Sequence, residues 1–166
     1  MSIEVRAVQP EEHEEAGQVT ALAYREFAVP GDVGWDEYLE RIADVARRAG
    51  RALVLGAFRD GRVLGTVTVE LDGRIEGGHE RDPLDPDEAH IRMLGVGPEA
   101  RGEGIGRMLM EAAVVEARAA GKRRMTLGTT ERMVAAQRLY ESMGFARGPD
   151  QVFDDGFRLR NYELPL

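Results

Sequence analysis

Residues 89–116 hold a pattern of residue types that can bind a phosphate group. An apolar run typical of a buried strand passes a turn at Gly97 and Pro98, and a glycine-rich loop, residues 101–106, then leads into an amphipathic helix. The first N–H groups of a helix have no intrahelical partners and lie at the positive end of its dipole. Glycine lets the backbone approach phosphate oxygens closely. The pattern therefore predicts an anion site made of main-chain amides.

Two common phosphate loops do not fit this segment. A dinucleotide fingerprint would need glycine at position 107, which is Arg107, and a Walker loop would need Lys and then Ser or Thr after Gly106. The segment instead resembles the Arg/Gln-x-x-Gly-x-Gly/Ala signature of the GNAT superfamily of N-acetyltransferases, with Arg101, Gly104 and Gly106 in the signature positions. In that family the loop holds the pyrophosphate of acetyl-CoA. Taken alone, the loop also fits a turn that only caps a helix.

A second motif strengthens the resemblance. Residues 135–145 match the A-x-x-L-Y-x-x-x-G-F pattern of these enzymes through Ala136, Leu139, Tyr140, Gly144 and Phe145. The two motifs are separated by the strand that the family has between them, so together they are far more specific than either alone. The resemblance covers nearly the whole chain, weakly before residue 50 and strongly over residues 89–145.

The resemblance implies which residues bind acetyl-CoA. Backbone groups of the strand at residues 91–96, notably those of Leu94 and Val96, would pair with the pantetheine arm like an added strand and leave an N–H for the thioester oxygen. Many relatives have Asn where this chain has Met133, and the loss of one polar contact should weaken binding modestly. The expected cofactor-binding residues are Leu94, Gly95, Val96, Arg101, Gly102, Glu103, Gly104, Ile105, Gly106, Arg107, Met133, Ala136 and Tyr140.

Tyr140 is the expected catalytic acid. In the family the tyrosine at this position protonates or hydrogen-bonds the sulfur of coenzyme A. A phenol with an ordinary pKa near 10 is protonated at neutral pH and can donate. The alternative is a helix tyrosine that only packs in the core.

The expected base comes from the start of the central strand, where Glu88 and His90 lie, with Glu70 on the preceding strand. His90 stands where several relatives have a glutamate, and imidazole is largely neutral at physiological pH without special tuning. A histidine on a strand can equally be structural, and many relatives use chains of water instead of one base. No role is predicted for His13 or His79.

Apolar periodicity predicts the elements that position these residues. Their order, β-α-α-β-β-β-α-β-α-β-β, indicates an α/β (α+β) fold in a single domain, residues 1–166, with a central mixed, mostly antiparallel sheet of six to seven strands and helices on both faces. Strands are expected at residues 3–8, 51–58, 62–71, 91–96, 124–129, 145–147 and 157–164. Helices are expected at residues 10–27, 35–49 and 105–119, and from a cap at Thr130 to Met143.

Composition narrows the class of protein. No apolar run of about 18 residues and no signal-peptide core are present, so the chain is expected to be soluble and cytoplasmic, away from the membrane. Zero cysteines exclude thiol nucleophiles and cysteine metal sites, and no metal is expected. The net charge of −8 argues against non-specific nucleic-acid binding and mildly favours cationic small partners.

Two segments are candidates for the acceptor site. The aromatic residues Tyr24, Phe27, Trp35 and Tyr38 either pack a helix pair or line an acceptor pocket. The acidic segment 72–88, with seven acids and two arginines, is either solvated or attracts a cationic amine.

The sequence thus predicts an acetyl-CoA-dependent N-acyltransferase that acetylates a primary amine of a small molecule or peptide by direct transfer in a ternary complex, and allows for a homodimer. The alternatives are a catalytically silent acyl-CoA-binding regulatory domain and an interaction module whose loop binds no nucleotide.

Overall fold

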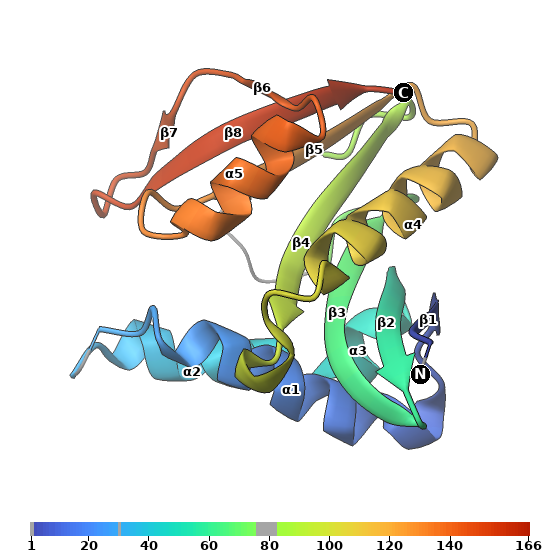
Figure 1. The fold of residues 1–166 in the computed structure, drawn as a ribbon. Helices are drawn as coiled ribbons and strands as arrows, with labels where there is room; N and C mark the ends of the chain where they lie inside the picture. Colours follow the sequence, from blue (N-terminus) through green and yellow to red (C-terminus); the bar gives the residue numbers. More distant parts are fainter. Residues whose placement is uncertain (1, 30, 76–82) are drawn as a thin grey trace.

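The strands and helices follow the predicted order along the chain, with α3 and β7 as additional elements among the described residues. The computed structural model describes residues 2–29, 31–75 and 83–166 (Figure 1). The first half holds β1 (Glu4–Ala7), the 3-10 helix η1 (Pro10–Glu12), α1 (His13–Arg25), α2 (Val33–Ala43), α3 (Val45–Ala49), β2 (Leu53–Arg59) and β3 (Arg62–Glu70). The second half holds β4 (Glu88–Val96), η2 (Pro98–Ala100), α4 (Ile105–Ala119), β5 (Arg124–Thr129), α5 (Val134–Ser142), β6 (Ala146–Arg147), β7 (Gln151–Val152) and β8 (Arg158–Pro165).

One mixed sheet connects all the strands of the described residues. Its order is β1-β2-β3-β4-β5-β8-β6, and β7 pairs with β8. Every pair is antiparallel except β4 with β5, which run parallel. The predicted mixed, mostly antiparallel sheet is therefore confirmed. It has eight strands instead of six or seven. The two-residue strand β6 lies within the strand expected at residues 145–147, whereas β7, also of two residues, is too short to show a pattern.

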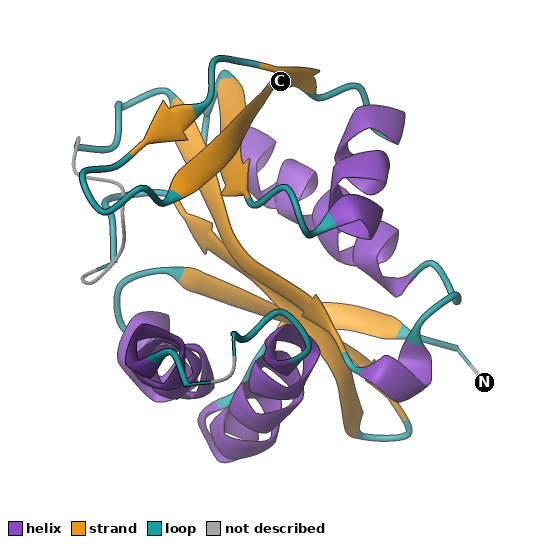
Figure 2. Cartoon of the chain, turned by 90° about the vertical axis from the view of Figure 1, so that its left-hand side faces the viewer, coloured by secondary structure: helices purple, strands orange, loops and turns teal. Residues whose placement is uncertain are grey.

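Helices cover both faces of the sheet, as predicted (Figure 2). On one face, inward residues of β2 and β3 such as Leu55 and Val67 join Leu109 and Met110 of α4 in the largest core cluster. On the other face, alternate strand residues pack with α1 and α3 in a smaller cluster. The alternation along each strand supplies an apolar surface to both helix layers, which fixes the sheet between them.

The predicted helix over residues 35–49 is wrong as a single element. The chain leaves helical geometry at Asp44, whose side chain accepts a hydrogen bond from the Arg47 amide at 3.2 Å and so caps a new helix, α3. The end of α2 lies so close to α1 that a β-carbon on Gly17 would sit 2.0 Å from the Ala43 carbonyl oxygen. The helix therefore breaks because of a side-chain cap and a close contact with α1. Neither of these changes the apolar periodicity of the sequence.

The predicted helix cap at Thr130 is also wrong. Helix α5 begins at Val134, and its cap residue Met133 makes no side-chain cap bond. Thr130 instead offers its carbonyl oxygen to the Gln137 side chain at 2.8 Å. The turn before α5 is therefore held by a side chain from within the helix.

The pH dependence of the free energy of unfolding between about pH 4.5 and 2 should come partly from one ion pair near the N-terminus. The Arg6 guanidinium holds the Glu12 carboxylate at 2.7 and 2.9 Å, and this bond lowers the pKa of Glu12 from 4.5 to about 2. The pair therefore stabilises the fold above about pH 4.5, and this contribution is lost as the pH falls towards 2. We expect Glu12→Gln to flatten the pH dependence of the free energy of unfolding in this range, measured by urea titration. Glu11→Gln, at an exposed neighbour, should leave the slope unchanged.

Candidate active site

The two parallel strands at the centre of the sheet separate and open a cavity. Residues 88–91 of β4 pair with residues 124–127 of β5, and beyond Ile91 and Leu127 the two strands have no common pairing. Figure 1 shows them meeting at one end and diverging towards the other. A cavity of about 360 Å³ lies at this fork. On the side of β5, the main chain of β4 after Ile91 is therefore open to a ligand.

A bulge in β4 lies beside the fork. Met93 and Leu94 stand opposite the single residue Val67 of β3, and Met93 has a φ of 53°, a backbone conformation that bulky residues rarely adopt. Gly95 lies just beyond the bulge and pairs with Thr66 of β3. A β-carbon there would lie 3.1 Å from the Ala23 β-carbon, so its absence lets α1 pack on the strand. The bulge changes which side chains face the cavity.

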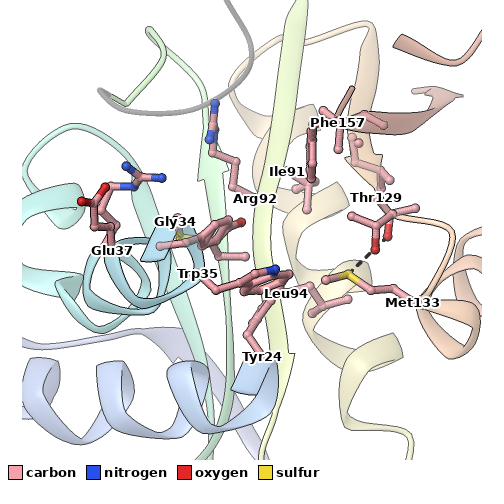
Figure 3. Close-up of a pocket in the computed structure, with 18 of the residues that line it drawn as sticks. Tyr24, Gly34, Trp35, Glu37, Ile91, Arg92, Leu94, Thr129, Met133 and Phe157 are labelled. Carbon is pink, nitrogen blue, oxygen red and sulfur yellow. Dashed lines mark hydrogen bonds between the residues drawn. The ribbon is translucent and has the colours of Figure 1, made fainter. Parts of the chain in front are cut away.

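The cavity lies between the N-terminal helices and the C-terminal third of the chain. Figure 3 shows Tyr24, Gly34, Trp35 and Glu37 on one side of β4, and Thr129, Met133 and Phe157 on the other. The β4 residues that line it are Ile91, Arg92, Met93 and Leu94. Three parts of the chain that are distant in sequence therefore form its walls.

Tyr140 lines the cavity from helix α5 and also belongs to the core. Its ring lies 5.8 Å from the Phe145 ring and 5.9 Å from the Tyr162 ring, and only 5% of its surface is exposed. Burial raises the pKa of the Tyr140 phenol well above its usual range. Among the described residues, its hydroxyl has no hydrogen-bond partner. Tyr140 is thus a protonated donor, held in place by aromatic packing, with its donor group unused.

The glycine-rich loop has an open backbone conformation at two of its glycines. Gly102 and Gly104 have φ values of 82° and 77°, and nothing lies within 4 Å of the position that a β-carbon would take on either. Gly104 precedes the first turn of α4 and no side chain caps that helix. The first amides of α4 are consequently free of a side-chain cap, in open space, as an anion site requires.

The side chains of this loop anchor it to the rest of the molecule. Arg101 pairs with Glu26 at 2.5 Å, Glu103 with Arg59 at 2.7 Å, and Arg107 reaches Ser142 on α5 at 2.5 Å. Ile105 is buried in the main core. Arg107 also lies 3.9 Å from Glu111. The charged side chains of Arg101, Glu103 and Arg107 are therefore all engaged within the protein, which leaves the main-chain amides of the loop for a ligand.

Close packing between α4 and α5 brings the loop near the cavity. A β-carbon on Gly106 would lie 3.3 Å from the Leu139 side chain and 3.9 Å from Val96. Leu139 is the neighbour of Tyr140, and Ala136 lines the cavity one turn earlier in α5. Of the predicted cofactor residues, Leu94, Met133, Ala136 and Tyr140 line the cavity, whereas Gly95 and Val96 do not.

Glu88 and His90 form a buried network beside the fork. His90 Nδ1 lies 2.8 Å from the Thr126 hydroxyl, which donates to Glu88, and His90 Nδ1 lies 3.9 Å from the Glu88 carboxylate. Burial opposes ionisation of Glu88, but bonds from Thr126 and from the Asp85 amide outweigh it and lower the pKa of Glu88 below its ordinary value. Neither His90 nor Glu88 lines the cavity.

Arg92 is a cavity residue that the sequence analysis missed. Its Nε donates to Glu70 at 3.1 Å, and Glu70 is fully buried. Glu70 is therefore occupied by an ion pair instead of standing free as a base. An arginine within an apolar strand matches no motif. The only sequence signal for a buried arginine here was a possible partner carboxylate, Glu70, on the preceding strand.

Three of the four aromatic residues stack on one another and also line the cavity. Tyr38 stacks with Trp35 at 5.7 Å and with Tyr24 at 6.3 Å, and all three line the cavity. Phe27 does not line it. In the acidic segment 72–88, residues 76–82 lie outside the described residues, and with them Glu76, His79, Glu80 and Asp82.

Two further features bear on the class of protein. Within residues 2–29, 31–75 and 83–166, no helix has the length and apolar character needed to cross a membrane. In the same ranges, no group of three or more His, Asp or Glu side chains is placed to hold a metal ion.

Comparison with known proteins identifies the family. Residues 17–145 match the model of the acetyltransferase (GNAT) family, and the chain belongs to this family. The PaiA N-acetyltransferase of Thermoplasma acidophilum, solved in complex with coenzyme A, superposes with a TM-score of 0.73 at 18% identity over 99% of this chain and 100% of that one. That likeness confirms the predicted fold.

Curated relatives match over shorter stretches. A mycothiol acetyltransferase of Thermobispora bispora is 35% identical over 91 residues, which are 55% of this chain and 29% of the relative. An IAA acetyltransferase of Azospirillum brasilense is 38% identical over 96 residues, 57% of this chain and 56% of the relative. The matched part thus spans between about a third and about half of the length of these relatives.

Proposed function

We propose that this chain is an N-acetyltransferase that transfers the acetyl group of acetyl-CoA to a primary amine by direct transfer in a ternary complex. Family membership supports the acetyltransferase activity. The observation that carries the mechanism is Tyr140, a buried phenol with no hydrogen-bond partner among the described residues, in the wall of the cavity at the β4–β5 fork.

The described residues fit coenzyme A. The uncapped first turn of α4 and the two open glycines, Gly102 and Gly104, would bind the pyrophosphate through main-chain amides. The unpaired edge of β4 at Leu94 would hold the pantetheine arm, and Met133 and Ala136 supply apolar contact. The coenzyme supplies a thioester, the activated acyl group that the amine takes up.

The roles of the chain follow from this placement. The main-chain N–H groups of β4 beside the fork stabilise the negative charge that develops on the thioester oxygen. As the carbon–nitrogen bond forms and the carbon–sulfur bond breaks, the Tyr140 hydroxyl donates a proton to the departing sulfur. As the amide forms, the nitrogen loses a second proton, which restores the Tyr140 hydroxyl through water. His90 and Glu88 take up the proton that the ammonium group loses and pass it to solvent. They act through water, since neither side chain lines the cavity.

We expect His90→Ala to lower kcat/KM about tenfold near neutral pH. This is less than the roughly 100-fold effect of a base in direct contact, because water carries the proton. The loss is measured as thiol release across a pH series. Full activity of His90→Ala at every pH would show that His90 has no part in proton transfer.

Two assays test the proposal as a whole. A thermal shift with acetyl-CoA separates a coenzyme-binding protein from an interaction module. Thiol release with a panel of amines then separates an enzyme from a silent acyl-CoA-binding domain. Stabilisation by acetyl-CoA without turnover of any amine would favour the silent domain.

The activity of the whole protein, its location in the cell and its oligomeric state belong to the proposal as well. Because the chain matches only part of its curated relatives, the activity of the whole protein is inferred from the site and not from their names. A cytoplasmic location and a homodimer are predictions from the sequence, and the mass in solution would test the second.

A further inference from the structure

A small arginine-lined recess adjoins the proposed acceptor cavity. It has a volume of about 50 Å³, and its charged lining is Arg41, Asp44, Arg47, Arg48 and Arg51. The recess is large enough for one small group, such as a carboxylate, and too small for an aromatic ring. Four guanidinium groups and one carboxylate in one place stand out in a chain whose net charge is −8.

Arg48 is a buried cation whose hydrogen bonds go only to neutral groups. It is 4% exposed and donates to the Thr68 hydroxyl at 3.1 Å and to the carbonyl oxygens of Arg41 and Ile42 at 3.0 and 2.7 Å. Its remaining nitrogen, Nη2, is buried without a hydrogen-bond partner. Within the described residues Arg48 forms no ion pair. The Asp44 carboxylate lines the same recess and attracts the Arg48 charge without forming an ion pair with it. Burying a charge that is only partly compensated is costly, and a bound anion would offset that cost.

Arg41 joins the recess to the cavity. Arg41 and Met93 line both spaces. The Arg41 guanidinium lies 5.6 Å from the centre of the Tyr38 ring and forms no ion pair among the described residues. It is exposed, so it can turn towards a ligand at little cost. An anion at this junction would meet Arg41 directly and lie beside the charge of Arg48.

The chemical character of the cavity wall changes from one side to the other, and a bound acceptor would have to match it. Tyr140 and Thr129 lie on the side of α5 and β5, and Arg41 lies on α2. Between them are the aromatic rings of Tyr24 and Tyr38 and the apolar bulge residue Met93. An acceptor that reaches from one side to the other therefore has an amine, an apolar middle and an anionic end.

We propose that the acceptor is an amine that carries an anionic group at its far end, as an ω-amino acid does, and that Arg41 and Arg48 select it through that group. This inference rests on the proposed function. The reaction converts the amine and the thioester to an amide and a free thiol, and the proton of the ammonium group passes to solvent. The anionic group takes no part in the bond changes and contributes only to recognition.

Matched amines test this inference. β-Alanine, γ-aminobutyrate and δ-aminovalerate are compared with ethylamine, propylamine and butylamine, which lack only the carboxylate, with thiol release as the readout. We expect at least one amino acid to exceed its matched amine about tenfold in kcat/KM. Aminoalkylphosphonates of the same lengths distinguish a phosphate-bearing from a carboxylate-bearing acceptor, and a preference for either supports an anionic end.

The variant Arg41→Gln tests whether Arg41 is responsible for the preference for an amine with an anionic end. It should reduce the ratio of kcat/KM between the amino acid and its matched amine to near one, through KM. Arg118→Gln, at an exposed arginine on α4 away from both spaces, should preserve the ratio. A preference that survives Arg41→Gln would overturn the assignment.

A binding measurement covers the case of slow turnover. The N-acetylated amino acid and the matched N-alkylacetamide are titrated into the protein with coenzyme A present. Equal affinities, or equal turnover of both amine series, would refute the anionic acceptor and leave the proposed acetyl transfer intact. Failure of coenzyme A itself to bind would instead refute the proposed function.

Discussion

Replacing Tyr140 with phenylalanine is expected to lower kcat about 100-fold while the affinity for acetyl-CoA stays nearly the same. The aromatic ring supplies the packing against Phe145 and Tyr162, so the substitution keeps the core and removes only the donor. Burial raises the pKa of this phenol, so it stays protonated through the alkaline range. The basic limb of the pH profile should therefore not belong to Tyr140. Steady-state thiol release and calorimetry with coenzyme A measure the two effects.

Tyr162→Phe is the matched control for this substitution. Tyr162 belongs to the same aromatic cluster, but its hydroxyl donates to Glu141 at 3.0 Å and it does not line the cavity. Its loss should reduce stability by about 1 kcal/mol and leave kcat unchanged. If Tyr140→Phe also keeps full kcat, Tyr140 is a packing residue and the acid must be sought elsewhere.

Gly104→Asp is expected to weaken acetyl-CoA binding about 100-fold, equivalent to about 2.8 kcal/mol. The substitution places a carboxylate at the start of α4, where the proposed pyrophosphate binds. Two unit charges about 4 Å apart near a protein surface repel by roughly 4 kcal/mol, which is enough for this effect. Because such repulsion is screened by salt, the loss should shrink as ionic strength rises.

Gly121→Asp provides the matched control at the opposite end of the same helix. Gly121 has a φ of 78°, against 77° for Gly104, and both have open space where a β-carbon would lie. The backbone strain is therefore similar in the two variants, and only Gly104→Asp should change the dissociation constant for coenzyme A in calorimetry. Equal affinities of the two variants would show that the amides of α4 do not bind the pyrophosphate.

Much of the fold could be predicted from the sequence because its signals are local. The apolar period of α4, the alternation in β3 and the bounds of β5 are properties of short segments, and each element formed where the pattern placed it. The glycine-rich loop was predictable for the same reason, since positive φ at Gly102 and Gly104 requires no distant partner. The break at Asp44 was missed because a cap and a contact with α1 do not alter the periodicity.

The site was predictable only as far as motifs reach. Tyr140 and Ala136 belong to one motif, Met133 lies three residues before it, and all three line the cavity. The sequence could not show whether His90 and Glu88 act as a base or form a structural network. The answer depends on Thr126 of a neighbouring strand, whose hydroxyl contacts both side chains. Phe157 and Asp155 line the cavity from a turn that carries no signature of its own.

The sequence by itself determined the family motifs, the helical and strand periods and the glycine positions of the loop at residues 101–106, because each depends on residues close together along the chain. The tertiary structure decided where β4 and β5 separate, that Met93 bulges into the fork, and that Arg41 and Arg48 lie beside the cavity. These features arise from contacts between segments far apart in the chain, so their energy depends on packing that no local pattern records.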